Sequence, residues 1–427
     1  MTAKWPEFRR EATAGVTTFF TMAYIVVVNP AILSSEGTGM PFSGVMTATV
    51  LLSASMTLLM GVYARLPFAV APGMGINAFF AYSIILGQGV PWPQALGIVF
   101  WAGVLFLAIS VVPLREAVAR AIPGNLRIAA AAGIGIFLTF IGLKNAGIVV
   151  SDPATLVKLG PLGLRQVLAL AGLAVTVWLL SRKSSLAFLG GIFLVTALGW
   201  GAGLVQVPAS LVSPPDFGVF LKLDALGALK AAYLPAIAAI CFTDLFDSIS
   251  TFVGVSQATG MVDEKGHPRN LREGLIVDAW ATLGAGLAGT SSGTAYIESA
   301  AGIEAGGRTG LTAVITALCF LPCLFLAPLA GMVPGFATAP VLILVGALMF
   351  RSVRGLKLEA LEDAVPAYLT LVLIPLTFSI TQGLLWGFLS QAGLYALAGR
   401  AREVGKGLWS LAALSAGLLL LEHGPWR

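Results

Sequence analysis

The stretch Ala71-Pro-Gly-Met-Gly-Ile-Asn-Ala-Phe-Phe-Ala-Tyr-Ser83 decides the fold. It lies in an apolar segment, yet Pro72, Gly73 and Gly75 interrupt any regular helix at its start. We expect extended backbone there, followed by a half-helix that begins near Asn77. Non-helical backbone at membrane depth is tolerated only where protein or a water-filled cavity surrounds it. The stretch therefore predicts a membrane protein with a protein-lined site in its interior.

The composition of the whole chain supports a protein made almost entirely of membrane spans. Of its 427 residues 57% are hydrophobic and only 11% are charged, whereas an ordinary globular domain is about 25% charged. A spanning helix needs roughly 20 mainly apolar residues. The chain therefore has room for a dozen or more spans and leaves none for a soluble catalytic domain, so we expect no enzyme.

Fourteen apolar segments are separated by charges or by Pro and Gly clusters. They lie at 13–33, 43–64, 70–86, 92–113, 122–143, 164–181, 185–205, 231–258, 273–289, 294–303, 309–331, 337–350, 364–380 and 382–399. The third and the tenth are too short or too interrupted to cross alone. Because they are seven segments apart, an odd number, the second half would enter the membrane from the other side. This predicts a 7+7 inverted repeat whose binding site lies at the two broken segments. Whether the remaining apolar stretch, 407–421, spans the membrane stays open.

Lys and Arg give the orientation. With a cytoplasmic N-terminus, 1–12, nineteen basic residues fall on the cytoplasmic side and five in the opposite loops, with the terminal Arg427 left uncounted. This bias is typical of a multi-pass protein, and we expect it to lie in the plasma membrane. The basic residues are scattered among loops and form no patch, so no nucleic-acid partner is expected.

Carboxylates inside apolar segments are the candidate functional groups. An Asp at the centre of a membrane helix costs about 2.5–3.5 kcal/mol on insertion scales, so each requires a reason. Asp244 and Asp247 are three residues apart in 231–258 and share a helix face. Glu298 lies within the broken segment 294–303. We expect substrate contact and proton carriage at Asp244 and Glu298, with Asp247 either beside them or one layer behind. The alternative is a polar contact that pins two helices together.

Two further acids are given structural roles. Asp278 is expected to be a charge near the membrane interface or paired with another helix, because it follows Arg272 and Glu273 closely. Glu304 is expected in a loop, with Arg308 as its partner.

The coupling ion must be carried by carboxylates. His267 and His423 lie in a charged loop and at the C-terminus, away from any span. Proton coupling would therefore use Asp244, Asp247 or Glu298. Sodium coupling through the same acids and backbone oxygens remains an alternative. No other cofactor and no metal site is expected.

The sequence resembles the nucleobase:cation symporters of the second class, and within them the hypoxanthine, guanine and adenine permeases. The matching stretches are Glu11-Ala-Thr-Ala-Gly-Val-Thr-Thr-Phe-Phe-Thr-Met-Ala-Tyr-Ile-Val-Val-Val-Asn-Pro30, Ala71-Pro-Gly-Met-Gly-Ile-Asn-Ala-Phe-Phe80, Phe242-Thr-Asp-Leu-Phe-Asp247 and Thr294-Ala-Tyr-Ile-Glu-Ser-Ala-Ala-Gly-Ile-Glu-Ala-Gly-Gly-Arg-Thr-Gly310. The likeness extends over nearly the whole chain.

The resemblance implies an all-α fold of fourteen segments in two inverted repeats of seven. The third and tenth segments would each contain a short strand and a half-helix. The repeats would divide into a core domain, 13–113 and 231–331, and a gate domain, 122–205 and 337–421. Members of the family are often homodimers, so a homodimer is expected here.

The resemblance also implies a site for a purine nucleobase. Glu298 would accept hydrogen bonds from the base, with Asp244 as the second acid. The backbone at Asn77 and Ala78 would supply amides. Tyr296 and Ile297, which precede Glu298, complete the expected site.

The resemblance favours purines over uracil. Uracil-type relatives carry a Glu and, a turn later, a His, where this chain has Asp244 and Ser248. We therefore expect import of hypoxanthine, guanine, adenine or xanthine by proton symport, through an elevator movement of core against gate. The alternatives are transporters of the same fold for uracil, another pyrimidine or an inorganic anion.

Overall fold

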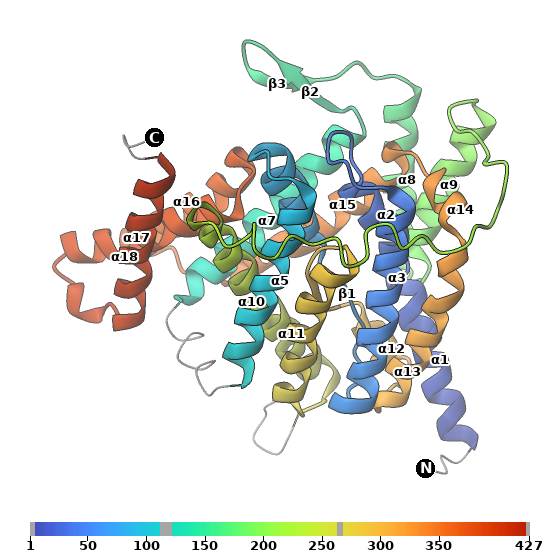
Figure 1. Cartoon of the computed structure of the whole chain (residues 1–427), viewed down its shortest axis with the longest axis horizontal. Coiled ribbons are helices and arrows are strands. Elements are labelled where there is room, and N and C mark those ends of the chain that lie inside the picture. The colour runs from blue at the N-terminus through green and yellow to red at the C-terminus, as the bar shows by residue number, and fades with distance from the viewer. Residues whose placement is uncertain (1–4, 112–121, 263–267, 424–427) are drawn as a thin grey trace.

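The computed structural model describes residues 5–111, 122–262 and 268–423 and is dominated by helices (Figure 1). The α-helices are α1 (Trp5–Met22), α2 (Ile25–Leu33), α3 (Phe42–Leu59), α4 (Met74–Ala78), α5 (Trp92–Val111), α7 (Gly124–Asn145), α8 (Leu164–Ser181), α9 (Ala187–Gly201), α10 (Leu234–Thr259), α11 (Leu271–Ala288), α12 (Ser299–Glu304), α13 (Gly310–Phe320), α14 (Ala327–Gly331), α15 (Gly335–Phe350), α16 (Leu361–Thr377), α17 (Ile380–Leu397) and α18 (Lys406–His423). The π-helices are η1 (Met60–Ala64) and η2 (Phe79–Gly87), and the 3₁₀ helices are η3 (Ala231–Tyr233), η4 (Leu321–Phe325), η5 (Arg351–Gly355) and η6 (Ala401–Glu403). The strands are β1 (Val70–Pro72), β2 (Val149–Asp152), β3 (Leu156–Leu159) and β4 (Gly293–Ala295).

The helices confirm the fold class expected from the apolar segments. Each of the fourteen segments corresponds to a helix or to a broken helical unit, and the expected end of the fourth at 112–113 lies outside the described residues. Seven helical stretches are long and apolar enough to cross a membrane: Pro6–Leu33, Phe42–Ala64, Trp92–Val111, Gly124–Asn145, Leu164–Ser181, Ala231–Gln257 and Gly335–Gly355. The chain is a polytopic membrane protein. The extra apolar stretch forms α18, which packs against α17.

The two broken segments meet at the centre of the molecule through their strands (Figure 1). β1 and β4 pair antiparallel, with Val70 opposite Ala295 and Pro72 opposite Gly293. Each strand leads to a short helix, α4 after β1 and α12 after β4. The half-helix after β1 begins at Met74, a few residues earlier than near Asn77, because the chain turns directly into it from extended Gly73. The predicted strand-and-half-helix pair is thus confirmed.

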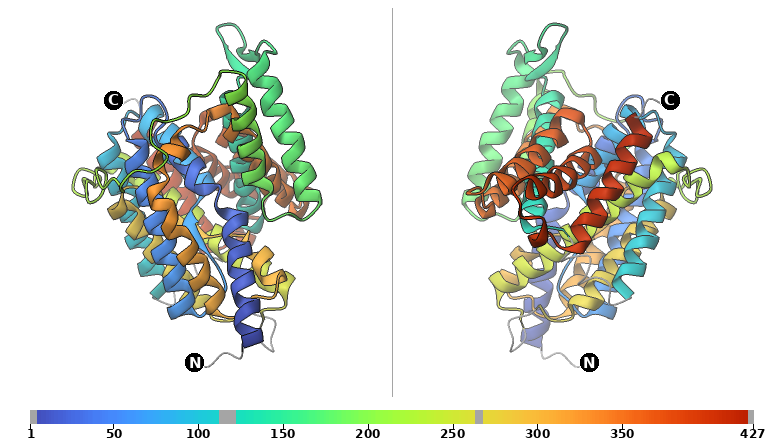
Figure 2. Two further views of the ribbon diagram at one scale, coloured as in Figure 1. Left: turned by 90° about the vertical axis from the view of Figure 1, so that its right-hand side faces the viewer. Right: turned by 90° about the vertical axis from the view of Figure 1, so that its left-hand side faces the viewer.

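The remaining helices pack in two groups. α1 to α5 and α10 to α14 surround the paired strands, with α11 lying along α5 and α13 along α1 and α3. α7, α8 and α9 pack with α15, and α16 packs on both α7 and α17. Figure 2 shows α8 and α9 on one side of the first group. The site is therefore built mainly within the first group, and the second group lies against it.

A crossing of α7 and α15 depends on small residues. A Cβ added at Gly346 would come closer than 3.0 Å to the carbonyl of Gly135 and the hydroxyl of Thr139. We expect Gly346→Ala to lower the melting temperature of the purified protein, because overpacking typically costs about 1–3 kcal/mol. Gly393→Ala in α17 is the matched control, since a Cβ there meets nothing within 4 Å. Equal melting temperatures for the two variants would contradict this close approach.

A small hairpin that the hydropathy pattern did not indicate projects from the end opposite the N-terminus (Figure 2). β2 and β3 pair between α7 and α8. Lys158 Nζ lies 2.8 Å from Asp152 Oδ2, and the amide of Ala154 donates to Asp152 Oδ1 at 2.9 Å. Lys158 and the loop amides lower the pKa of Asp152 to about 2. The turn therefore keeps its ionised carboxylate at any pH the cell meets.

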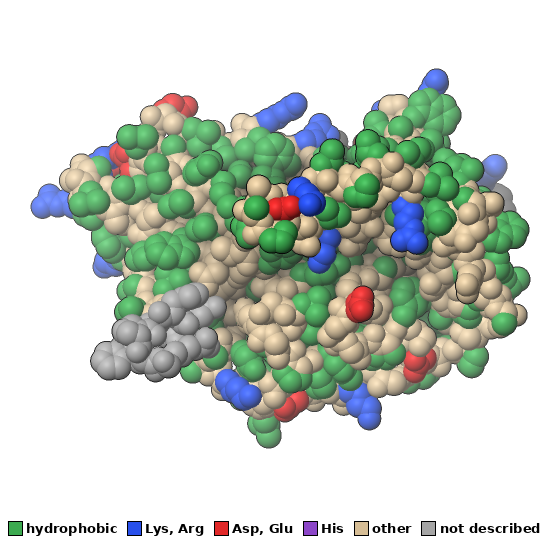
Figure 3. All heavy atoms as spheres, turned by 90° about the horizontal axis from the view of Figure 1, so that it is seen from above, with side chains coloured by type: hydrophobic (Ala, Val, Ile, Leu, Met, Phe, Trp, Pro, Cys, Tyr) green, Lys and Arg blue, Asp and Glu red, His purple; other side chains and the backbone are tan. Residues whose placement is uncertain are grey.

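Lys and Arg are spread over this same end of the molecule. Figure 3 shows them among hydrophobic side chains, with no single basic patch on that face.

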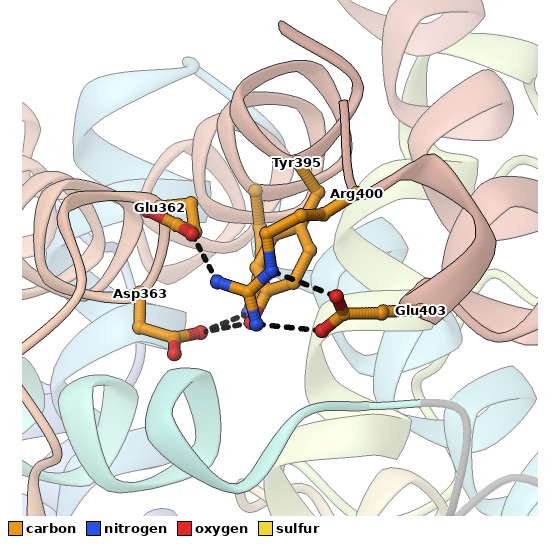
Figure 4. Close-up of polar contacts among 6 residues, drawn as sticks. Glu362, Asp363, Tyr395, Arg400 and Glu403 are labelled. Carbon is orange, nitrogen blue, oxygen red and sulfur yellow. Dashed lines mark hydrogen bonds and ion pairs between the residues drawn. The ribbon is translucent and has the colours of Figure 1, made fainter. Parts of the chain in front are cut away.

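A polar cluster holds the linker between α17 and α18 (Figure 4). Arg400 donates to both carboxylate oxygens of Glu403, at 2.8 and 2.6 Å, and to Glu362 at the start of α16. The guanidinium lowers the pKa of Glu403. Beside it, Tyr395 donates to Asp363 at 2.9 Å. These contacts tie the ends of α16 and α17 to η6.

Candidate functional site

Glu298 lies where β4 ends and α12 begins. It is the residue before the first turn of α12, and its side chain is half-buried. Its Oε1 accepts a hydrogen bond of 2.8 Å from the hydroxyl of Tyr24. Tyr24 is buried at the break between α1 and α2. The predicted acid is thus placed where two interrupted segments meet, β4–α12 and α1–α2.

Asp244 lies on α10, directly behind β4. It is completely buried, and its Oδ2 accepts hydrogen bonds from Ser292 Oγ at 2.5 Å and from the hydroxyl of Thr282. In the described part of the chain, its Oδ1 has no hydrogen-bond partner. Asp244 therefore ties α10 to α11 and to the residue that precedes β4. Its second oxygen remains free for a further donor or a proton.

Asp247 is more accessible than Asp244. It lies one helical turn further along α10 and is half-buried. Its carboxyl group is close enough to that of Glu298 for the two acids to affect each other electrostatically. Among the described residues it has no hydrogen bond to a protein group. Asp247 and Glu298 are consequently the two of these acids that are partly exposed and also have oxygen atoms free to accept from a ligand.

Asp278 lies inside the protein and is not the exposed charge that one of its two expected placements describes. It is completely buried in α11, and its Oδ2 accepts a hydrogen bond of 3.1 Å from the amide of Ala295 in β4. The position near Arg272 suggested an exposed helix end, but the strand supplies a backbone donor that no local pattern reveals. Asp278 supports the strand that carries Glu298.

Asn77 uses both its side chain and its backbone within the protein. Its Oδ1 accepts from the hydroxyl of Ser291, and its amide donates to Gly73 O at 2.9 Å. The amide expected to face a ligand at Asn77 is therefore occupied, because α4 begins earlier than anticipated. Ala78 is buried at the end of α4. In the described part of the chain, the unoccupied amides of this half-helix belong to its first turn.

Tyr296 and Ile297 differ in accessibility. Tyr296 is buried, and its hydroxyl donates to Pro72 O at 2.5 Å, which closes the pair of strands. Ile297 is 63% exposed. Of these two neighbours of Glu298 in the sequence, Ile297 is therefore the accessible one.

Two buried groups that frame the site escaped the sequence analysis. Asn29 in α2 donates to Thr49 at 2.7 Å and to Thr290 at 2.9 Å, which joins three segments. Tyr24 belongs to the same stretch of α1 and α2. The sequence marks each of them only as a polar residue in an apolar segment. Many Thr and Ser residues of this chain have the same property, so this signal does not single out Tyr24 or Asn29.

The loop after α12 differs from its expected pairing. Arg308 donates through its guanidinium to Ile303 O at 2.9 Å rather than to Glu304. The acid that binds this loop is Glu11 of α1, which accepts from the amides of Arg308 at 3.1 Å and Thr309 at 3.4 Å. Glu11 lies about three hundred residues away in the sequence, so local spacing could not reveal it.

The candidate site has an acidic character. Within the described residues, none of the ion pairs involves Asp244, Asp247, Asp278 or Glu298. A hollow of about 550 Å³ lies elsewhere, between α1 and the start of α9, and is lined by Arg9, Thr13 and Phe20 among others. The arrangement can accept hydrogen bonds from a neutral or cationic ligand, and it can hold a proton.

Known proteins resemble this chain over most of its length. The profile of the Permease family matches residues 9–385. The adenine permease AdeP of Escherichia coli is 41% identical, over 93% of this chain and 89% of its own. The guanine/hypoxanthine permease PbuO of Bacillus subtilis is 39% identical, over 93% of both chains.

A solved structure has the same fold. The transmembrane domain of the cyanobacterial bicarbonate transporter BicA superposes with a TM-score of 0.66 at 18% identity, over 89% of this chain and 98% of that one. This likeness supports the 7+7 inverted repeat. From the family match and the close relatives, the chain belongs to the Permease family, within the group that contains the adenine and guanine/hypoxanthine permeases.

Proposed function

We propose that this protein imports a purine nucleobase, namely hypoxanthine, guanine, adenine or xanthine, by proton symport. The observation that carries the proposal is Glu298, a half-buried acid at the broken segment whose protein hydrogen-bond partner is the hydroxyl of Tyr24. The names of the relatives AdeP and PbuO add adenine, guanine and hypoxanthine as the substrate class.

The chemistry of the site suits a purine. A purine base presents ring N–H donors at its edge and two apolar faces. Glu298 retains Oε2 as an acceptor for such a donor, and Asp247 offers a second carboxylate nearby. The exposed side chain of Ile297 offers apolar surface to the ring. A buried acceptor that a ligand leaves unpaired costs about 1–3 kcal/mol, which favours bases with donors at these positions.

Asp244 acts from behind this pair. Because it is enclosed and already accepts from Ser292 and Thr282, we assign it to holding β4 and to carrying charge rather than to the first contact with the base. Proton coupling then belongs to Glu298, Asp244 and Asp247 together. An ionised carboxylate resists desolvation, so the loaded and protonated site moves across the membrane more readily than the site with base alone.

The movement is proposed to follow the two packing groups. The core would comprise 13–113 and 231–331, and the gate 122–205 and 337–421, of which 112–113 lie outside the described residues. The core would slide against the gate as an elevator. We further propose a homodimer in the plasma membrane, with the N-terminus, 1–12, in the cytoplasm; residues 1–4 of that segment lie outside the described residues.

An anion substrate is disfavoured by charge. Four acids near β4 without a described cation partner would repel bicarbonate or sulfate. The likeness to BicA therefore concerns the fold.

Uptake in cells tests the proposal. Radiolabelled hypoxanthine, guanine, adenine, xanthine and uracil are supplied to a bacterial strain that lacks its own base permeases and expresses this chain. We expect at least one purine to accumulate, a protonophore to abolish the accumulation, and uracil to be excluded. Accumulation of uracil alone, or of no base, would contradict the proposal. Purine accumulation that needs sodium but resists the protonophore would contradict proton coupling and identify sodium as the coupling ion.

A further inference from the structure

Tyr24 connects Glu298 with the second group of helices. Its hydroxyl donates to Glu298 Oε1 at 2.8 Å, and its ring lies 4.8 Å from the ring of Phe188, centroid to centroid, at an angle of 50°. Phe188 lies in the first turn of α9. One side chain therefore touches both the acid of the candidate site and the opposing group of helices.

The geometry leaves Tyr24 little freedom. The side chain is 1% exposed and Phe188 is 3% exposed, so neither ring can turn without moving its neighbours. Tyr24 also lies at the break between α1 and α2, where the backbone is not held by a continuous helix. A displacement of Glu298 at the hydroxyl of Tyr24 can therefore move the tyrosine ring against Phe188.

The hydroxyl has one proton to donate, and that proton is committed to Glu298. A hydrogen bond to a charged acceptor contributes more than one to a neutral acceptor. The bond should therefore be strongest when Glu298 is ionised and without ligand. When Glu298 accepts a proton or binds a base, its hydrogen bond with the hydroxyl of Tyr24 weakens. The ring of Tyr24 can then change its contact with Phe188.

We infer that Tyr24 is a positioning residue that orients Glu298 for the substrate and reports the state of Glu298 to α9 through Phe188. The inference rests on the proposed function, because it assigns a role within the same site. It separates two tasks of one side chain: the hydroxyl orients the carboxylate, and the ring links that carboxylate to the helix against which the core would move.

The two tasks are tested with two conservative variants. Tyr24→Phe removes the hydroxyl and keeps the ring, so we expect KM for the transported purine to rise roughly tenfold or more with a smaller change in Vmax. Phe188→Leu keeps apolar volume but removes the ring pair, so we expect Vmax to fall roughly two- to tenfold with KM nearly unchanged. Kinetics of purine uptake are measured at equal amounts of protein in the membrane.

Tyr63→Phe is the matched control. Tyr63 is 50% exposed in η1, so loss of its hydroxyl should leave both kinetic constants as in the unaltered protein. A purely structural role for Tyr24 would lower Vmax or the amount of folded protein without raising KM, and that result would overturn the inference. A rise in KM for Phe188→Leu as large as that for Tyr24→Phe would also overturn the division of tasks. Absence of purine uptake by the unaltered protein would instead refute the proposed function.

Discussion

Glu298→Gln is expected to abolish accumulation of purine bases. The amide keeps the shape of the side chain and can still accept from Tyr24, but it cannot take up a proton in the relevant range. Since the proposed cycle needs Glu298 to alternate between ionised and neutral forms, uphill uptake should fall to the level of untransformed cells. The measurement is the steady-state ratio of internal to external radiolabelled purine.

Glu304→Gln provides the control for this variant. Glu304 ends the same short helix but is exposed, and we expect its variant to accumulate purine normally. Accumulation at the unaltered level by Glu298→Gln, with the protein in the membrane at its usual amount, would remove Glu298 from the coupling mechanism. Exchange of internal for external base is allowed in that variant, because exchange requires no net movement of protons.

Asp244→Asn is expected to reduce transport by roughly ten- to hundredfold, the second-largest effect. The carboxylate accepts from Ser292 and Thr282 in a fully buried place, and hydrogen bonds to a charged group contribute about 1.5–3 kcal/mol each. An amide has one oxygen to accept from these hydroxyl groups, and its NH₂ group would lie buried where Asp244 Oδ1 has no partner among the described residues. We therefore expect a lower melting temperature together with a lower Vmax.

Comparison with Asp247→Asn decides how the two acids divide their roles. If Asp247 contacts the base, its variant should raise the dissociation constant for purine more than Asp244→Asn does. A binding assay on purified protein measures this without transport. A large loss of affinity in Asp244→Asn alone would return the direct contact to Asp244, as the family resemblance first implied.

The sequence predicted the spans and the broken segments because both follow from local composition. Pro72 and Gly73 interrupt a helix whatever the surrounding structure. The apolar segments are long enough for each to be recognised by itself. Glu298 stood out for the same reason, as an acid in a short segment between apolar neighbours. These features need no knowledge of what lies across the protein.

The partners of the acids could not be predicted in this way. The hydrogen bond between Tyr24 and Glu298 joins residues 274 positions apart, and its donor is one of many hydroxyl groups in apolar segments. Asp278 resembled a charge at a helix end until β4 provided an amide for it. The separation of Asp244 from Asp247 by burial likewise depends on where β4 crosses α10. Long-range packing, rather than spacing along the helix, determines which acid remains accessible.

Proton movement with the base is the most direct test of the account. Purified protein is reconstituted into liposomes that contain a pH-sensitive dye, and a purine gradient is imposed without sodium. We predict that inward flow of the purine acidifies the lumen, and that Glu298→Gln vesicles show no acidification. Purine entry without any change of internal pH, or acidification that persists in the Glu298→Gln vesicles, would contradict the claim that this carboxylate carries the proton.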